Sequence, residues 1–206
     1  MKKLKVVTVL GTRPEIIRLS VIIKKFDEFF DHTLVHTGQN YDYTLNGIFF
    51  EELDIRKPDF FLEVVGENLG ETMGNVLSKS YKLFSEIKPD ALLVLGDTNS
   101  GLCTISAKRL KIPIFHMEAG NRCFDQNVPE ELNRKIADHT SDVNLTYTEN
   151  SRRYLLAEGF KKDHVFCVGS PLKEVLDFYS DKIDGSSILE KFQLKKRKYI
   201  VASIHR

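Results

Sequence analysis

The sequence predicts an α/β fold in which helices flank a Rossmann-like parallel sheet. Short runs rich in Val, Ile, Leu and Phe recur along the 206 residues without alternating with polar residues, as in strands that are covered on both faces. Amphipathic segments with helical periodicity separate most of these runs. Strands that alternate with helices in this way form βαβ units, and such units build a parallel sheet.

The expected elements follow in chain order. We expect strands at Leu4–Leu10, Thr33–Thr37, Phe60–Val64, Ala91–Leu95, Ile112–Met117, Val143–Tyr147, Val165–Val168 and Tyr199–Ile204. Glu15–Phe29 and Glu71–Ile87 carry the clearest apolar stripes among the helical segments. Pro14, Pro129 and Pro171 stand where helices should begin, because a proline at the first helical position loses no hydrogen bond.

One segment, Ser180–Lys198, is a candidate domain boundary. It is rich in Asp and Ser and ends in the basic run 195–198, after which a new apolar run begins. A length of 206 residues allows one or two domains. We therefore expect a first domain at 1–180, a linker at 181–198 and the first strand of a second, truncated domain at 199–206.

The composition is that of an ordinary globular protein, with 42% hydrophobic residues, 29% charged residues and a net charge of +1. It excludes disorder and collagen, and it gives no chain-wide attraction to nucleic acid or to an acidic membrane. Cys103, Cys123 and Cys167 are too few and too scattered for a disulfide framework or a zinc knuckle. The apolar run Val6–Leu10 is too short for a secretory signal. We predict a cytoplasmic protein with reduced thiols.

Polar residues collect where the expected strands end, which is where open α/β sheets bind ligands. Five segments occupy that position: 11–15, 36–40, 96–100, 116–122 and the helix start at 129–134. In the first, a glycine turn leads into a helix. Its free N–H groups and Arg13 suit an anion, although a plain turn with a solvated Arg13 fits equally well. No G-x-G-x-x-G or Walker loop indicates a dinucleotide or ATP.

Three carboxylates, Asp97, Glu118 and Glu130, are expected to converge on this cleft. Their mutual repulsion would raise the pKa of at least one of them, and a carboxyl group with a near-neutral pKa suits general acid or base catalysis. Two of them also have a simpler explanation: Asp97 as a helix N-cap, and Glu130 with Glu131 as first-turn charges that favour the helix dipole. Their occurrence together favours a functional site.

The remaining candidates are basic. His116 lies within an apolar strand and is predicted to be a hydrogen-bonded core residue, whereas His205 follows the last strand and is better placed to contact a ligand. Arg122 and Arg134 could neutralise phosphate or form surface ion pairs of little energetic weight. No spacing indicates a metal site or a covalent nucleophile.

Taken together, these segments resemble the non-hydrolysing UDP-N-acetylglucosamine 2-epimerase family. The motifs follow the family's order along the whole chain: Val9-Leu10-Gly11-Thr12-Arg13-Pro14-Glu15, Thr37-Gly38-Gln39, Gly96-Asp97-Thr98, Glu118-Ala119-Gly120, Pro129-Glu130-Glu131-Leu132-Asn133-Arg134 and His205-Arg206. Each motif alone is weak, and together they are highly specific.

The resemblance implies a GT-B-like pair of Rossmann-like domains with the nucleotide bound between them. It implies catalytic roles for Asp97, Glu118, Glu130 and His205. It also implies contacts to the substrate or nucleotide from a second set of residues: Arg13, Gln39, Arg122, Arg134 and Arg206.

Members of the family eliminate UDP to give a 2-acetamidoglycal, then add it back after protonation of C2 from the other face. The resemblance therefore implies a UDP-sugar substrate and no cofactor. It further implies a homodimer that supplies precursors for cell-surface polysaccharide such as capsule or O-antigen, with no nucleic-acid or membrane partner.

Two segments depart from the common family pattern. Asn121 stands where the family usually has leucine, and the loop up to Pro129 looks two residues shorter. This loop and residues 36–43 resemble the branch that makes UDP-N-acetyl-L-fucosamine from UDP-2-acetamido-2,6-dideoxy-L-talose. A hydrolysing 2-epimerase and a GT-B glycosyltransferase are the alternatives, and the chain ending at Arg206 could also be an inactive fragment.

Overall fold

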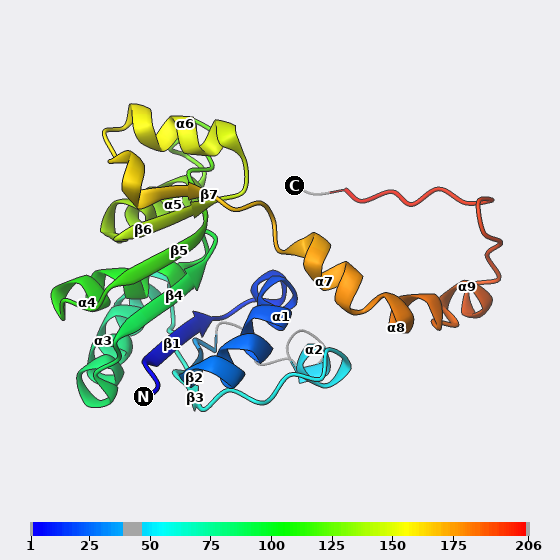
Figure 1. Cartoon of the computed structure of the whole chain (residues 1–206), viewed down its shortest axis with the longest axis horizontal. Coiled ribbons are helices and arrows are strands. Elements are labelled where there is room, and N and C mark those ends of the chain that lie inside the picture. Colours follow the sequence, from blue (N-terminus) through cyan, green and yellow to red (C-terminus); the bar gives the residue numbers. More distant parts are fainter. Residues whose placement is uncertain (1, 39–46, 205–206) are drawn as a thin grey trace.

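A seven-stranded sheet forms the centre of the computed structural model, which describes residues 2–38 and 47–204. The strands are β1 (Lys5–Leu10), β2 (Asp31–His36), β3 (Phe60–Phe61), β4 (Ala91–Leu95), β5 (Ile114–Ala119), β6 (Val143–Thr146) and β7 (Val165–Cys167). All pairings are parallel, in the order β3-β2-β1-β4-β5-β6-β7 (Figure 1). The predicted fold class is confirmed, and the strand order reverses between β1 and β4, where such sheets bind ligands.

Helices cover both faces of the sheet. The first face packs against α1 (Arg13–Phe29) and α2 (Gly47–Glu52). The opposite face packs against α3 (Leu69–Ile87), α4 (Cys103–Arg109) and α5 (Pro129–Thr140), with the 3₁₀ helix η1 (Asn99–Leu102) leading into α4. At the sheet edge α6 (Glu149–Ala157) packs on β7, and the short 3₁₀ helix η2 (Lys162–His164) precedes that strand.

Neighbouring residues of each central strand enter different cores, which explains why the apolar runs do not alternate with polar residues. In β4, Leu92 and Val94 pack towards α3 and α4, whereas Leu93 and Leu95 pack towards α1. All four side chains are buried. Burial of each such side chain contributes about 1.5–3 kcal/mol, so the two cores hold the strand ends and their turns in place.

The C-terminal segment leaves the sheet after α7 (Leu172–Phe178). Val175 and Tyr179 pack against Val21 of α1, and then α8 (Ser180–Asp184) and α9 (Ile188–Lys191) run away from the sheet (Figure 1). The expected strand at 199–204 is not formed. A strand needs a neighbouring ladder, and in the described chain residues 199–204 have none. The boundary between a first and a second domain stays a prediction.

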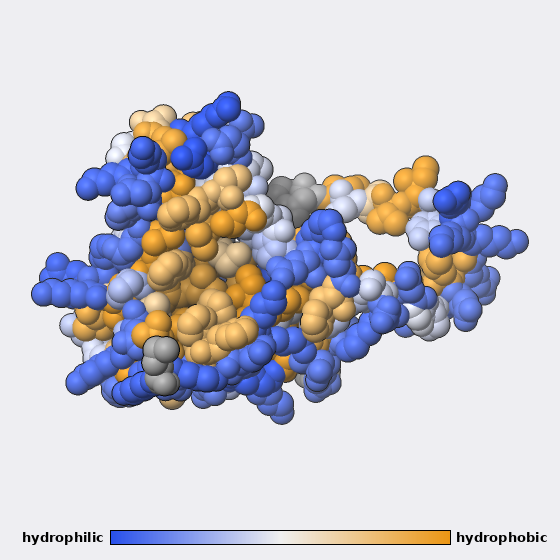
Figure 2. All heavy atoms as spheres, viewed as in Figure 1, coloured by the Kyte–Doolittle hydropathy of each residue, from blue (hydrophilic) through white to orange (hydrophobic). Residues whose placement is uncertain are grey.

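An apolar hollow of about 380 Å³ lies on the α1 side of the sheet. Figure 2 shows apolar residues gathered over the strands on this side. The lining is apolar throughout: Leu4, Val6, Ile22, Phe26, Phe30, Ala91, Leu92, Leu93, Phe115, Met117 and Leu145. Because it has no polar side chain to orient a charged ligand, it is not the candidate active site.

Candidate active site

Asp97 and Glu118 lie at the carboxyl ends of two neighbouring strands. Asp97 follows β4, and Glu118 belongs to the end of β5, which pairs with β4. Across this pair the Gly96 N–H donates to the Met117 carbonyl at 2.9 Å. The charge of Asp97 acts on Glu118 and raises the pKa of that carboxyl group. The structure thus brings together two of the three carboxylates predicted to converge.

A β-bulge directs the Glu118 side chain. The register of β5 against β6 shifts between Met117 and Ala119, and Glu118 has a φ of 66°. Met117 packs on the α1 side of the sheet, so a regular strand would send residue 118 to the opposite side. The bulge instead lets Glu118 form an ion pair with Arg18 of α1. A non-glycine residue in this backbone region costs about 1–3 kcal/mol, and such strain gathers at functional sites.

The surroundings of Glu118 favour its protonated form. Burial raises the pKa of this carboxyl group, Arg18 opposes the rise, and the negative charge of Asp97 adds to it. Gly96 makes room for the carboxylate, because a Cβ at Gly96 would lie 3.3 Å from Oε2 of Glu118. A carboxyl group whose pKa moves towards neutrality can both accept and donate a proton.

Arg134 of α5 holds Asp97. Its Nη2 lies 2.7 Å from Oδ2 of Asp97, and its Nη1 donates to Oε2 of Glu131 at 3.2 Å. Thr98, not Asp97, is the N-cap of η1, since its hydroxyl oxygen accepts from the Ser100 N–H. The simpler explanation of Asp97 as a cap is therefore wrong, and its carboxylate pairs with Arg134 at the strand end.

Glu130 and Glu131 have different positions although they are adjacent. Glu131 is buried and accepts hydrogen bonds from the N–H groups of Cys123 and Phe124, at 3.0 and 3.3 Å. Burial alone would raise the pKa of Glu131, but these hydrogen bonds and the nearby cations outweigh it and lower the pKa to about 2. Glu131 thereby anchors the loop 121–128 to α5. Glu130 is exposed in the first turn of α5, and its catalytic role stays a prediction.

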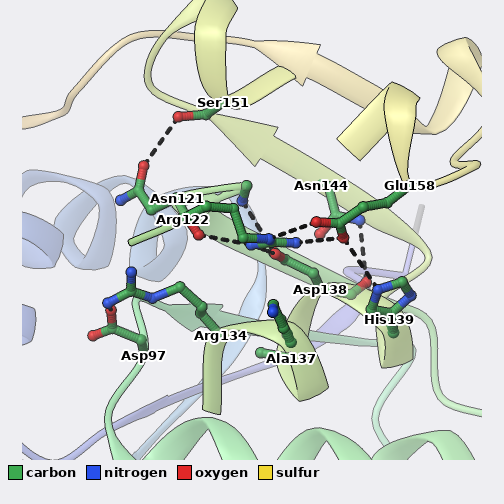
Figure 3. A network of polar contacts seen from close by, with 12 residues as sticks. Asp97, Asn121, Arg122, Arg134, Ala137, Asp138, His139, Asn144, Ser151 and Glu158 are labelled. Atoms are coloured by element: carbon green, nitrogen blue, oxygen red, sulfur yellow. Dashed lines mark hydrogen bonds and ion pairs between the residues drawn. The ribbon is translucent and has the colours of Figure 1, made fainter. Parts of the chain in front are cut away.

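Arg122 lies in a buried polar network (Figure 3). Its Nη1 donates to Oδ2 of Asp138 at 2.7 Å, and its Nε and Nη2 donate to the two carboxylate oxygens of Glu158, each at 2.7 Å. The side chain of Arg122 has no solvent exposure. The expectation that Arg122 binds phosphate finds no support here, because two carboxylates already occupy its guanidinium group.

This network also joins the turns that carry the two carboxylates. Asp138 accepts hydrogen bonds from Nδ1 of His116 at 2.8 Å and from the Gly120 N–H at 3.2 Å. The second ring nitrogen of His116 lies 2.8 Å from the Gly96 carbonyl oxygen. His116 is fully buried, so its predicted role as a hydrogen-bonded core residue is confirmed. Gly96 precedes Asp97 and Gly120 follows Glu118 closely, so the network fixes the spacing of both carboxylates.

Both ring nitrogens of His116 face acceptors, which requires an imidazolium ion. A carboxylate and a carbonyl oxygen have no proton to give, so each ring nitrogen must donate one. Burial would lower the pKa of His116, but the hydrogen bond and charge of Asp138 outweigh it and raise the pKa. The buried cation then acts on the neighbouring carboxylates, since its charge lowers the pKa of Glu118.

The turn after β1 differs from the expected anion site. The N–H groups of Gly11 and Thr12 both donate to Oε2 of Glu15, at 2.8 and 2.7 Å. They are therefore not free to bind an external anion. Glu15 also accepts from the Thr98 hydroxyl at 2.8 Å, which ties this turn to the one after β4. Arg13 is exposed at the first residue of α1, with its guanidinium carbon 6.0 Å from the centre of the Phe49 ring.

Three predicted site residues, Gln39, His205 and Arg206, lie outside the described residues. Sequence reasoning missed others. Arg18 and Asp138 belong to helices and reach the site only through packing, so no local motif announces them. The sequence offers one weak signal for these two residues. Both lie at least one turn into a helix that follows a motif at the carboxyl edge of the sheet. In the described part of the chain no group of three or more His, Cys, Asp or Glu side chains could hold a metal ion. Across residues 2–38 and 47–204, no helix is long and apolar enough to cross a membrane.

Comparison with known proteins agrees with this fold. A family model described as UDP-N-acetylglucosamine 2-epimerase matches residues 24–206. The chain therefore belongs to the UDP-N-acetylglucosamine 2-epimerase family, whose members are isomerases. A Methanococcus maripaludis protein named UDP-N-acetylglucosamine 2-epimerase homolog is 37% identical over 206 residues, which are 98% of this chain and 57% of the relative.

Solved structures give the same result. The structure of UDP-N-acetylglucosamine 2-epimerase from Rickettsia bellii is 57% identical with a TM-score of 0.88, over 94% of this chain and 52% of that one. The Methanocaldococcus jannaschii UDP-GlcNAc 2-epimerase, in complex with UDP-GlcNAc and UDP, is 36% identical with a TM-score of 0.86, over 91% and 52%. The chain thus spans about half the length of the relatives it matches.

Proposed function

We propose that this chain supplies the carboxylate-bearing half of a UDP-sugar 2-epimerase, which inverts C2 of a UDP-2-acetamido sugar. The observation that carries the proposal is the pair of carboxylates at adjoining strand ends, each held by an arginine from a different helix. The M. jannaschii enzyme in complex with UDP-GlcNAc and UDP supports a UDP-sugar as the substrate.

The proposed reaction proceeds by elimination and addition. A base removes the proton from C2 while the bond from C1 to the UDP oxygen breaks, which gives a 2-acetamidoglycal and UDP. An acid then delivers a proton to the other face of C2 while the UDP oxygen bonds again to C1. Both steps need groups that exchange protons near neutral pH. Glu118 suits this task because burial raises its pKa, and Asp97 is the second carboxylate at this edge.

The diphosphate needs cationic contacts, and the described residues offer few. Arg13 is exposed at the start of α1 and has no carboxylate partner among the described residues. It is therefore the best-placed hydrogen-bond donor to the diphosphate in that part of the chain. Arg134 already forms ion pairs with Asp97 and Glu131, which leaves its guanidinium group less able to bind phosphate. The contacts expected from Gln39, His205 and Arg206, and the catalytic roles of Glu130 and His205, remain part of the proposal.

The identity of the sugar is proposed at the level of its class. The loop 121–128, held by Glu131, borders the carboxylates and would shape the sugar pocket. Its resemblance to the UDP-N-acetyl-L-fucosamine branch makes UDP-2-acetamido-2,6-dideoxy-L-talose a candidate beside UDP-GlcNAc and UDP-ManNAc. We further propose that the protein acts as a homodimer in the cytoplasm and supplies precursors for cell-surface polysaccharide.

The test follows C2 inversion by NMR in the complete gene product, whether or not it is longer than 206 residues. Each candidate UDP-sugar is incubated with the wild type and with Asp97→Asn, Glu118→Gln and the exposed control Asp163→Asn. We expect the first two variants to lose at least about 100-fold in rate, as is typical when a general acid or base is removed, while their folds survive. The control should keep its activity.

Four results would contradict the proposal. Turnover of none of these sugars would exclude the epimerase, and wild-type rates in Asp97→Asn and Glu118→Gln would remove both residues from the mechanism. Irreversible release of UDP would indicate a hydrolysing enzyme, and turnover that requires an added acceptor would indicate a glycosyltransferase.

A further inference from the structure

Tyr147 lies beside Glu118 at the edge of the sheet. It directly follows β6, and the preceding residue, Thr146, pairs with Ala119 of β5. Leu145 lies on the α1 side of the sheet, where it lines the apolar hollow. The charges of Glu118 and Arg18 both act on the Tyr147 phenol, so its ring lies near the place where these two side chains meet.

The hydroxyl group of Tyr147 is buried and, among the described residues, has no hydrogen-bond partner. Leaving such a group without a hydrogen bond costs about 1–3 kcal/mol. We therefore expect the Tyr147 hydroxyl group to find a partner in another state of the site. Burial and the negative charge of Glu118 raise the pKa of Tyr147, and the nearby Arg18 opposes them. The phenol therefore stays neutral, and it can donate or accept a hydrogen bond.

The charged groups around Glu118 do not provide a hydrogen-bond acceptor for its protonated carboxyl group. Arg18 of α1 can only donate, so it has no acceptor for the proton of a protonated Glu118. On β5, His116 uses both nitrogens for Asp138 and Gly96. After β4, Asp97 is paired with Arg134. Among the described residues, the Tyr147 oxygen is a buried acceptor near Glu118 that the structure leaves unused.

We propose that Tyr147 is a positioning residue for Glu118, whose hydroxyl oxygen accepts a hydrogen bond from the protonated carboxyl group while Arg18 holds the ionised one. The carboxyl group then alternates between two partners as it takes up and releases a proton. That role in turnover rests on the proposed epimerase function, whereas the hydrogen bond itself does not.

The first test is the pH dependence of kcat in the complete gene product, for the wild type, Tyr147→Phe and the control Tyr81→Phe on the exposed face of α3. A partner that stabilises the protonated carboxyl group raises its pKa, so removing the hydroxyl group lowers it. We expect the limb of the pH profile that reflects Glu118 to move to lower pH by about 0.5–1 unit in Tyr147→Phe. A shift of this size corresponds to the free energy of one neutral hydrogen bond. An unmoved limb, or one moved to higher pH, would overturn the proposal.

The second test does not need activity, so it separates this proposal from the epimerase proposal. The 206-residue chain is labelled with ¹³C at glutamate carboxyl groups, and Glu118 is assigned by its absence in Glu118→Gln. We expect the Glu118 titration to shift to lower pH in Tyr147→Phe and to stay unchanged in Tyr81→Phe. Unchanged titration in Tyr147→Phe would refute the hydrogen bond even in an active epimerase.

Thermal unfolding provides a third readout. At a pH where Glu118 is ionised, the hydroxyl group has no partner among the described residues, so Tyr147→Phe should leave the Tm unchanged or raise it slightly. A fall of several degrees at that pH would show that the hydroxyl group has a structural partner, and would overturn the proposal.

Discussion

Each candidate catalytic carboxylate is controlled by residues that lie far from it in the sequence. Arg18 is 100 positions from Glu118, and Arg134 reaches Asp97 from α5. The cations favour the ionised carboxylates, whereas burial and the repulsion between Asp97 and Glu118 favour protonation. For Glu118 the second influence is the stronger, which makes it the carboxyl group best suited to carry a proton near neutral pH.

His116 gives a prediction about pH dependence at the same scale. Its pKa is raised in the folded protein, so its pair with Asp138 stabilises the fold fully below the ordinary histidine pKa of about 6.5. That contribution is lost as the pH rises through the folded-state pKa. We expect urea unfolding to show a free energy of unfolding that falls over this range in the wild type, and this component to be absent in His116→Gln.

Nitrogen-15 NMR provides an independent check of the charge on His116. Both ring nitrogens should carry a proton at pH 7 in the wild type. In Asp138→Asn the pKa should fall, because the carboxylate that raises it is gone. A neutral tautomer of His116 at pH 7 in the wild type would contradict the imidazolium assignment.

The turns after β1, β2 and β4 are packed against one another at the sheet edge. Thr37 and Ser100 are joined by a hydrogen bond between their hydroxyl groups at 2.9 Å. Gly11 lies so close to this pair that a Cβ there would be 2.0 Å from the Thr37 oxygen and 2.4 Å from the Ser100 oxygen. The absence of a side chain at Gly11 thus lets the turns meet, and it does so without a left-handed backbone.

Gly11→Ala and Gly74→Ala form a matched pair at the scale of elements. We expect Gly11→Ala to destabilise the fold by about 1–3 kcal/mol, because overpacking forces the turns apart. Gly74 lies inside α3, and a Cβ there would meet nothing within 4 Å. Gly74→Ala should therefore stabilise by about 0.5–1 kcal/mol. Urea unfolding measures both changes, and equal effects of the two substitutions would contradict the close approach at Gly11.

The whole molecule has a net charge of +1, but in the candidate site most arginines are already paired with carboxylates. Arg18, Arg134 and Arg122 each have a carboxylate partner, and Arg13 has none among the described residues. A nucleotide diphosphate would have to compete with these carboxylates, which weakens the attraction that the arginines could otherwise provide.

Calorimetry of UDP with the 206-residue chain tests this consequence. We expect binding weaker than micromolar, that is, less favourable than about −8 kcal/mol. Arg13→Ala should weaken whatever binding is measured, and Lys111→Ala, at the opposite edge of the sheet, should not. Micromolar binding by the wild-type chain would show that the described arginines suffice for the nucleotide.

The elements were the most predictable level of the structure. The apolar runs at 4–10 and 91–95 became β1 and β4 almost residue for residue, because a strand buried on both faces must be apolar along its whole length. The run at 199–204 has the same composition and forms no strand, because composition does not supply a ladder partner. The motif at Gly11–Glu15 predicted a helix start correctly, but Glu15 occupies the N–H groups that were expected to bind an anion.

By itself, the sequence determined the parallel sheet, the family, and the placement of Asp97 and Glu118 at one edge, because strand periodicity and turn residues act locally. Only the tertiary structure decided which arginine faces which carboxylate. It committed Arg122 to Asp138 and Glu158, it buried Glu131 but not Glu130, and it left the Tyr147 hydroxyl without a partner among the described residues. Ion pairs and burial depend on side chains that meet through packing, and packing joins residues that no local pattern connects.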